Sequence, residues 1–294
     1  MDSAVVAETL RQATIYLAHQ FFEVPLGSHF VMSGMRFALD GLPPAVGLWP
    51  VEVVLQISVE DVRRGSAGLN AMRTKIAFWH GGRVIARGEG DLTVLSARIY
   101  ARVRAATSAS RVGHYGAGVS VPGPDRVLAT GTVGEWELLL DPTDPVFFDH
   151  PVDHVPGMLI VEAVRQIARR TSGFLDGDLG QFSANFVRYL ELTEKTLLTV
   201  TAHALINPRQ WELALSVTQG SMTGATVTAT VNAATVKATN PTSRVPAQSP
   251  RAGFSTTPTD PRAPTPAESR STSLQRVAGD PFDSSGYSTP SARP

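Results

Sequence analysis

Apolar and polar residues alternate along the chain with periods that predict one helix followed by several strands. The stretch from Val5 to about Phe22, VVAETLRQATIYLAHQFF, has the length and propensity of a helix, and Asp2 or Ser3 can cap its first turn. The stretch is apolar on most sides. We therefore expect this helix to lie inside the protein, wrapped by other elements.

Four strand-like segments follow this helix. They are HFVMSGMRFAL, VEVVLQISVEDV, LNAMRTKIAFW and VIARGEGDLTVL. Between the last two, Gly81 and Gly82 predict a hairpin, because both glycines can adopt positive φ without steric cost. Residues Ala97 to Ala106 predict a short amphipathic helix, and the Gly-, Ser- and Pro-rich region through Pro124 predicts a connection.

The same order of elements then returns. VLAT and EWELLL predict strands, DPTDP predicts a turn, and a second helix is expected from about Met158 to Phe174. Four more strand-like segments follow it: QFSANFVRYLEL, TLLTVTAHAL, WELALSVTQ and ATVTATVNAATV. The repeated order of a helix and four strands indicates a duplication.

This pattern predicts four regions: a first half over 1–105, a linker over 106–126, a second half over 127–238 and a tail over 239–294. The tail is composed mainly of Pro, Ser, Thr, Ala and Arg, so it cannot bury enough surface to offset its ordering entropy, and we expect it to be disordered. The second helix is preceded by strands and a loop. The first half starts almost at its helix, so we expect its amino-terminal strand to be missing.

Composition narrows the possible functions. The 294 residues are 43% hydrophobic and 18% charged, with 26 basic and 26 acidic side chains, so no global field attracts nucleic acid or an anionic membrane. The absence of cysteine removes disulfides, thiolate zinc sites and thiolate nucleophiles, so catalysis must use oxygen or nitrogen groups. With no signal segment and no bilayer-length apolar run, we expect a soluble cytoplasmic protein.

The two predicted helices carry the same polar triplet. Glu8, Arg11 and Gln12 recur as Glu162, Arg165 and Gln166, 154 positions later. Positions i, i+3 and i+4 share one helix face, so each triplet forms a polar stripe. One interpretation is an ordinary surface ion pair, which contributes little to the stability of the fold. The flanking residues are largely apolar, however, and a buried acid and guanidinium must be paired or used, which favours a functional role.

The segment before the second helix carries further candidate chemistry. Asp149 and His150, then Asp153 and His154, lie in FFDHPVDHVPGM, and both imidazoles can transfer protons near neutral pH. Their spacing matches no standard carboxylate and histidine cluster, so we expect no metal, and structural hydrogen bonding remains an alternative, above all for His154. The amides at the helix start, around Gly157 and Met158, can stabilise an oxyanion.

The segment FFDHPVDHVPGMLIVEAVRQ resembles the A-factor biosynthesis hotdog-domain family, whose members make γ-butyrolactone or related signals. VAETLRQA with VPLGSHFVMSGMRF resembles the same family's amino-terminal half, so the resemblance runs from about Val5 to Val236. It implies an α+β fold, a tandem double hotdog in which a curved antiparallel sheet wraps each long central helix. The helix entry is also similar to that of hotdog dehydratases, but Phe148 stands where their catalytic histidine is expected.

The resemblance implies an acyltransferase that joins a β-ketoacyl chain from acyl carrier protein to the hydroxyl of dihydroxyacetone phosphate, without a cofactor. It implies that Glu8, Arg11, Glu162 and Arg165 are the essential polar groups, supported by Gln12 and Gln166. As a hypothesis, Glu162 is the general base, the amides at the helix start hold the oxyanion, and Arg165 neutralises phosphate. Arginine suits phosphate because its fork makes bidentate bonds, and Arg169 lies close enough in sequence to assist.

Two alternatives stay open at this point. A hotdog thioesterase or dehydratase would share the fold and the acyl thioester substrate but would release an acid or an enoyl product. A non-catalytic homologue with a regulatory or binding role is favoured if the shortened first half forms no site. A homodimer is also compatible with the sequence.

Overall fold

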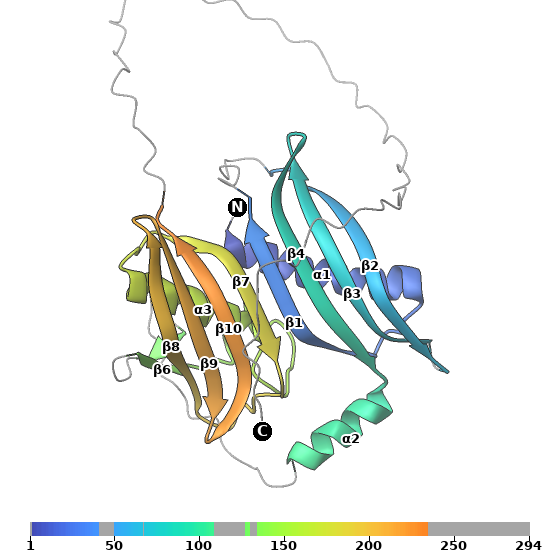
Figure 1. Ribbon diagram of the computed structural model, residues 1–294. Helices are drawn as coiled ribbons and strands as arrows, with labels where there is room; N and C mark the ends of the chain where they lie inside the picture. Colours follow the sequence, from blue (N-terminus) through green and yellow to red (C-terminus); the bar gives the residue numbers. More distant parts are fainter. Residues whose placement is uncertain (1, 41–49, 67, 109–126, 130–133, 235–294) are drawn as a thin grey trace, which may run out of the picture. The chain divides into compact units, whose positions relative to one another are not determined.

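The computed structural model describes residues 2–40, 50–66, 68–108, 127–129 and 134–234 (Figure 1). Most of the predicted linker and the whole predicted tail, 239–294, lie outside these residues. The elements are α1 (Ser3–Phe22), β1 (His29–Leu39), β2 (Val54–Gly65), β3 (Gly68–His80), β4 (Arg83–Leu95), α2 (Ala97–Ser108), β5 (Leu128–Ala129), β6 (Glu135–Leu138), α3 (Gly157–Ser172), β7 (Asp178–Phe186), β8 (Thr196–Asn207), β9 (Gln210–Gln219) and β10 (Met222–Asn232).

The strands form one antiparallel sheet of ten strands, in the order β2-β3-β4-β1-β7-β10-β9-β8-β6-β5. From the central pair of β1 and β7 outward, the first four strands on each side have the same connectivity, and β6 and β5 extend the second side. The prediction of a duplicated helix and four strands is therefore confirmed. Both long helices lie on the same face of the sheet (Figure 1). Residues 1–235 group into one compact unit, so the two halves share a sheet instead of folding as separate bodies.

A pair of phenylalanines packs where the two halves of the sheet meet. Phe37 on β1 lies opposite Phe182 on β7, and the two rings stack with centroids 5.3 Å apart. Both side chains are buried within a hydrophobic cluster that includes residues of both halves. Removing two aromatic rings from water at the central strand pair stabilises the contact between the halves.

Helix α1 packs on the sheet through one face only. Leu10 lies against Gly88, where an added Cβ would come 3.2 Å from the leucine side chain, so a glycine at that position allows the close approach. The buried hydroxyls of Thr14 and Thr74 are 2.8 Å apart and bond helix to sheet. Val5 and Tyr16 are more than half exposed. The sheet covers one face of the helix, as expected, but the prediction that the helix lies inside the protein is wrong for its outer face.

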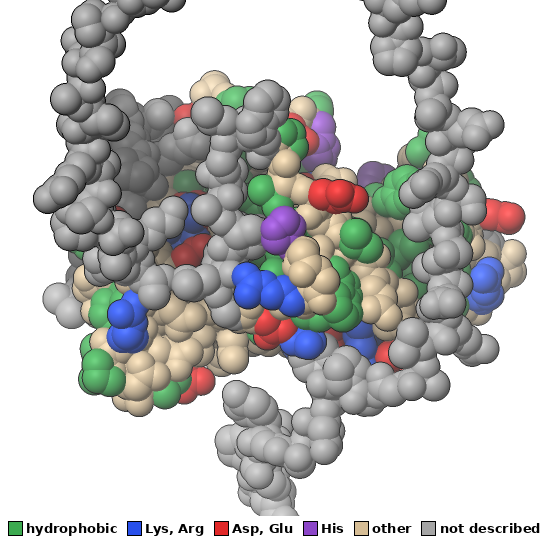
Figure 2. Space-filling model, turned by 90° about the horizontal axis from the view of Figure 1, so that it is seen from above, with side chains coloured by type: hydrophobic (Ala, Val, Ile, Leu, Met, Phe, Trp, Pro, Cys, Tyr) green, Lys and Arg blue, Asp and Glu red, His purple; other side chains and the backbone are tan. Residues whose placement is uncertain are grey.

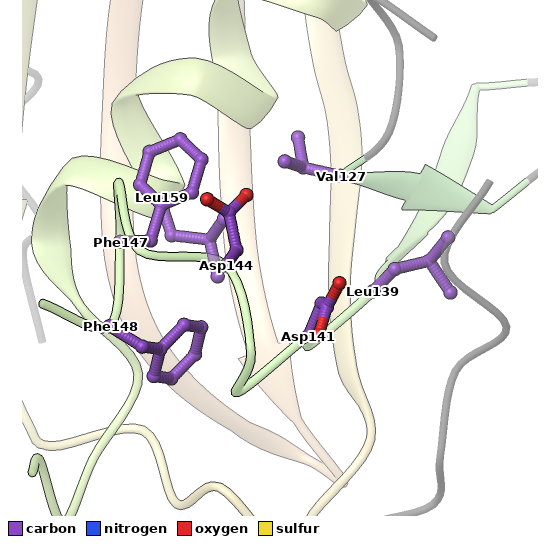
Figure 3. Close-up of a pocket in the computed structure, with 7 residues that line it drawn as sticks. All are labelled: Val127, Leu139, Asp141, Asp144, Phe147, Phe148 and Leu159. Carbon is purple, nitrogen blue, oxygen red and sulfur yellow. The ribbon is translucent and has the colours of Figure 1, made fainter. Parts of the chain in front are cut away.

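Helix α3 is more enclosed than α1. Its residues from Leu159 to Val164 are buried, and the segment before it packs against the same cluster through Phe147 and Phe148. In the close-up, Phe147 lies beside Leu159, with Val127 opposite (Figure 3). Among the described residues of the first half, no such segment covers α1. The covering segment before α3 therefore contributes to the greater burial of this helix.

Strand β7 ends six residues earlier than the sequence predicts, at Phe186 instead of Leu192. The chain leaves the ladder where Val187 donates to the carbonyl of Gly224, 2.9 Å away. It then passes the entry of α3, where Val155 donates to the carbonyl of Leu190 at 2.8 Å. The segment after β7 thus supports the loop that leads into α3. No helix among the described residues is long and apolar enough to span a bilayer.

Candidate active site

The two polar triplets have nearly the same internal bonding. On α3, Glu162 Oε2 accepts from Arg165 Nε at 2.7 Å, and Oε1 accepts from Gln166 Nε2 at 2.9 Å. On α1, Glu8 Oε2 accepts from Arg11 Nε at 2.9 Å. Its Oε1 accepts from Arg11 Nη2 at 2.7 Å and from Gln12 Nε2 at 2.8 Å. The structure therefore brings each predicted triplet together as one hydrogen-bonded unit.

The triplets differ in their exposure to solvent. The side chains of Arg165 and Glu162 are 15% and 11% exposed. Those of Arg11 and Glu8 are 30% and 40% exposed. Charges as enclosed as the second pair persist only when they are paired and hydrogen-bonded, as these are. The two helical sites are thus chemically alike but not equally accessible.

Local bonding keeps these groups charged. Burial by itself would raise the pKa of Glu8, but hydrogen bonds from Arg11 and Gln12 and the charge of Arg11 outweigh it and lower that pKa below its ordinary value. The hydrogen bond to Glu8 raises the pKa of Arg11. Burial opposes the charge of Arg165, yet its bond to Glu162 and nearby carboxylates raise its pKa.

Arg165 also contacts two carboxylates that sequence reasoning did not connect with it. Its Nη1 lies 2.7 Å from Asp2 Oδ2 and 3.9 Å from Asp178 Oδ1. Asp178 in turn accepts from the backbone N–H of Ser3 at 2.9 Å and from the Ser3 hydroxyl at 2.6 Å. The amino-terminal end of α1 is therefore bound to α3 and β7. The sequence marked Asp2 only as a cap, which it is, through a 2.8 Å bond from the N–H of Ala4.

The first Asp-His pair lies close to the other triplet. Asp149 Oδ1 is 2.6 Å from His150 Nδ1, and both side chains are well exposed. The charge of Asp149 acts on both Glu8 and Arg11, opposing ionisation of the glutamate and favouring the charged arginine. A loop of the second half thus reaches the triplet of the first, just as Asp2 of the first half reaches Arg165 of the second.

The second Asp-His pair belongs to a different network, formed with helix α2. His154 Nδ1 lies 2.7 Å from Asp153 Oδ1, and the same carboxylate oxygen accepts from the hydroxyl of Tyr100 at 2.6 Å. Arg104 donates through Nε to Asp153 Oδ2 at 2.9 Å. Its Nη1 and Nη2 each lie 2.8 Å from a carboxylate oxygen of Glu191. The sequence indicated the pair but gave no signal for these three partners.

This network fixes the loop that precedes α3. Arg104 is buried, its guanidinium lies 4.8 Å from the ring centroid of Tyr189, and its Nη2 donates to the backbone carbonyl of Asp153 at 2.6 Å. Burial alone would raise the pKa of Asp153, but bonds from Tyr100 and His154 and the charge of Arg104 lower it to about 2. Asp153 is therefore an ionised anchor at neutral pH.

The start of α3 is suited to receive an anionic oxygen. Pro156 occupies the cap position and contributes no side-chain hydrogen bond, and the helix begins at Gly157. The first amides of a helix have no intrahelical acceptor, so those around Gly157 and Met158 can stabilise developing negative charge. Arg169, by contrast, donates through Nε to the carbonyl of Gly177 at 2.6 Å. That bond ties the end of α3 to the turn before β7.

A small cavity lies beside the entry to α3. Its volume is about 10 Å³, and its walls include Phe147, Phe148, Leu159 and Asp144 (Figure 3). This space fits about one water molecule and not an acyl chain. Phe148 is an apolar wall of the cavity and packs against the hydrophobic core. A phenylalanine cannot transfer a proton, which argues against dehydration at this position.

Charged side chains are mixed with other types on one face of the molecule. On the face shown in Figure 2, acidic, basic and apolar side chains of the described residues are interspersed, without a broad area of one sign. The formal net charge of the chain is zero. Such a surface gives little long-range attraction for a polyanion, so recognition of a charged ligand must depend on individual groups in the site.

Comparisons with known proteins agree with this arrangement. Residues 1–96 and 124–235 match the A-factor biosynthesis hotdog domain. A 2-oxo-3-(phosphooxy)propyl 3-oxoalkanoate synthase of Streptomyces virginiae is 33% identical over 204 residues, covering 65% of this chain and 68% of that protein. A synthase of the same name from Streptomyces griseus is 32% identical over 188 residues, covering 58% of this chain and 60% of that protein.

Among solved structures, the 12:0-ACP thioesterase from Umbellularia californica superposes with a TM-score of 0.53 and 12% identity, covering 79% of this chain and 87% of that one. At this identity the likeness concerns the fold, and it confirms the double hotdog architecture. The family match extends over both halves of the sheet and over both polar triplets. The chain therefore belongs to the A-factor biosynthesis hotdog-domain family.

Proposed function

We propose that this protein is an acyltransferase that moves a β-ketoacyl chain from acyl carrier protein to the hydroxyl of dihydroxyacetone phosphate. The observation that carries the proposal is the pair of Glu-Arg-Gln triplets, bonded alike and placed on the two helices that contact each other where the halves meet. The synthases of Streptomyces virginiae and Streptomyces griseus are named for an ester of this composition, which supports the choice of substrates.

The proposed reaction is a transfer from a thioester to an oxygen ester. Glu162 accepts the proton of the attacking hydroxyl, whose oxygen forms a bond to the thioester carbonyl carbon. The carbon-sulfur bond then breaks, and the proton passes to the departing thiolate, so the reaction is balanced without a cofactor or metal. Arg165 and Gln166 hold the carboxylate of Glu162 in place through their bonds to its two oxygens.

The remaining proposed roles follow from position. The amides around Gly157 and Met158 stabilise the oxyanion of the tetrahedral intermediate, since α3 places its positive end there. Glu8, Arg11 and Gln12 form the second polar group of the site, and Asp149 with His150 lies beside it. The network of Asp153, His154 and α2 holds the connecting loop.

The test is product analysis with the full chain. Purified protein is incubated with a β-ketoacyl carrier-protein thioester and dihydroxyacetone phosphate, and mass spectrometry is used to detect the phosphorylated ester. Glu162→Gln keeps the shape of the side chain and one of its two acceptor positions but removes the base, so we expect at least a hundredfold loss of ester formation. Glu212→Gln, at an exposed position of β9, is the matched control and retains activity.

Other products would contradict the proposal in distinct ways. Release of a free β-keto acid without ester identifies a thioesterase, and an enoyl product identifies a dehydratase. Tight binding of the acyl carrier protein without any turnover indicates a binding or regulatory protein. A fully active Glu162→Gln variant would remove Glu162 from the mechanism while leaving the transferase activity in place.

A further inference from the structure

The two arginines of the repeated triplets have different surroundings. The guanidinium of Arg165 lies against three carboxylates, at 2.7 Å from Glu162, 2.7 Å from Asp2 and 3.9 Å from Asp178. One positive charge among three negative charges leaves an excess of negative charge at this place. A phosphate approaching Arg165 would have to displace Asp2 and would meet the two remaining carboxylates at short range.

The carboxylates around Arg165 are themselves held by the start of α1. Asp178 accepts both the N–H and the hydroxyl of Ser3, whose side chain is completely buried. Asp2 caps α1 with one carboxylate oxygen and contacts Arg165 with the other. Opening this arrangement would uncap the helix and loosen the contact between the halves. Arg165 therefore has the contacts of a residue that holds the two halves of the protein together.

Arg11 has the bonding pattern expected of a ligand-binding arginine. Its Nε and Nη2 are both directed to one carboxylate, that of Glu8. Within the described part of the chain its Nη1 has no hydrogen-bond partner, and its side chain is twice as exposed as that of Arg165, at 30% against 15%. A guanidinium fixed on one edge by an acid can offer its other edge to a phosphate oxygen.

The neighbourhood of Arg11 adds a second polar group. Asp149 lies close enough for its charge to act on Arg11, and its carboxylate is bonded to His150 at 2.6 Å. This carboxylate opposes an incoming anion, but Arg11 faces two acids, Glu8 and Asp149, whereas Arg165 faces three. The balance of charge is therefore less negative at Arg11 than at Arg165.

We infer that Arg11, and not Arg165, receives the phosphate group of the acceptor, while Arg165 orients Glu162 and closes the joint between the halves. This inference rests on the proposed function for the identity of the acceptor. It replaces the assignment of phosphate to Arg165 that the sequence suggested. Two triplets that look equivalent in the sequence therefore have different roles.

The experiment compares Arg11→Gln with its counterpart Arg165→Gln in the full chain. Inorganic phosphate and dihydroxyacetone phosphate are titrated against each variant, with tryptophan fluorescence and the shift of the thermal unfolding midpoint as readouts that need no turnover. We expect Arg11→Gln to weaken phosphate binding at least tenfold. Arg165→Gln should lower the unfolding midpoint and keep the phosphate affinity within about twofold of the wild type.

A turnover experiment adds a specificity ratio. The wild type should use dihydroxyacetone phosphate far better than unphosphorylated dihydroxyacetone, and Arg11→Gln should lower this preference at least tenfold by raising KM for the phosphorylated acceptor. Loss of phosphate binding in Arg165→Gln with retention in Arg11→Gln would overturn the inference, as would retention in both. A wild type that binds phosphate through Arg11 but forms no ester would refute the proposed function and support this inference.

A second variant covers the case in which Arg165→Gln does not fold. Asp2→Asn removes one carboxylate from Arg165 without altering either triplet. If phosphate binds at Arg11, the phosphate affinity of Asp2→Asn stays within about twofold of the wild type. A clear gain in affinity that persists in the Asp2→Asn, Arg11→Gln double variant would place the phosphate at Arg165 and contradict the inference.

Discussion

Arg165 Nη1 lies 2.7 Å from the carboxylate of Asp2, although the two residues are 163 positions apart in the chain. This contact joins the start of the first long helix to the middle of the second. The β1 and β7 strands pair beneath it, so the halves are joined both by the sheet and by the helices. The stability of the joint and the geometry of the second triplet are therefore linked.

Replacing Ser3 by alanine should weaken this joint. Its buried hydroxyl donates to Asp178 at 2.6 Å, and a hydrogen bond to a charged group contributes about 1.5–3 kcal/mol. Because Asp178 keeps its bond from the Ser3 backbone, we expect a loss near the lower end, about 1.5 kcal/mol in the free energy of unfolding. Urea unfolding measures this loss of stability. Ser58→Ala, on the exposed strand β2, is the control, and equal losses in both variants would refute the role of Ser3.

The stability of the protein should depend on Asp153 at acid pH. Its pKa is about 2 in the folded protein against 3.8 for an ordinary aspartate, so its ionised form stabilises the fold above about pH 4. This contribution is lost as the pH falls toward 2. For a half-exposed carboxylate we expect about 1 kcal/mol after allowing for solvent screening.

Urea unfolding at pH 6, 4 and 2.5 tests this dependence. Asp153→Asn should show a shallower decline than the wild type over this range, and Tyr100→Phe, which removes one hydrogen bond to the same carboxylate, should lie between them. Identical slopes for all three proteins would show that Asp153 does not act as an anchor.

Arg104→Ala should detach α2 and loosen the loop before α3. The substitution leaves the carboxylates of Asp153 and Glu191 without their arginine, and loss of one member of a buried ion pair, here that of Arg104 with Glu191, costs about 3–5 kcal/mol. Hydrogen exchange should increase over residues 149–157 in particular. Arg102→Ala, at an exposed position of the same helix, should neither detach α2 nor increase hydrogen exchange in the loop. Unchanged exchange in Arg104→Ala would mean that other contacts hold the loop.

Phe182→Ala should destabilise both halves together. The ring is buried at the central strand pair and stacks on Phe37, and truncation of a buried phenylalanine costs about 3–5 kcal/mol. Phe182→Leu should cost less than about 1.5 kcal/mol if the core can repack. Because the halves share one sheet and one core, unfolding should remain a single transition. Two separate transitions in the wild type would contradict this description.

Local features of the site were predictable from the sequence. The spacing of Glu8, Arg11 and Gln12 places the three side chains on one helix face in any α-helix, and the same holds for their counterparts on α3. Gly81 and Gly82 both have positive φ, as the hairpin prediction required. These features depend on residues only a few positions apart, so backbone geometry determines them.

The contacts that distinguish the two triplets were not predictable in this way. Asp2 and Asp178 reach Arg165, and Tyr100 and Arg104 reach Asp153, only because β1 pairs with β7 and α2 docks beside the entry to α3. Periodicity also suggested that α1 is enclosed, whereas its outer face is exposed. An apolar pattern shows which residues can be buried but not which segment covers them.

The sequence by itself determined the duplicated order of elements and the composition of the two triplets, because repeats, helical spacing and residue chemistry are local properties, and its resemblance to known proteins indicated the hotdog family. The tertiary structure decided which arginine is enclosed by acids and which keeps an open edge. That difference arises from long-range packing, which brings Asp2 to Arg165 and the loop with Asp149 toward Arg11. Electrostatic surroundings at a few ångströms are set by neighbours in space, and identical motifs can therefore acquire different roles.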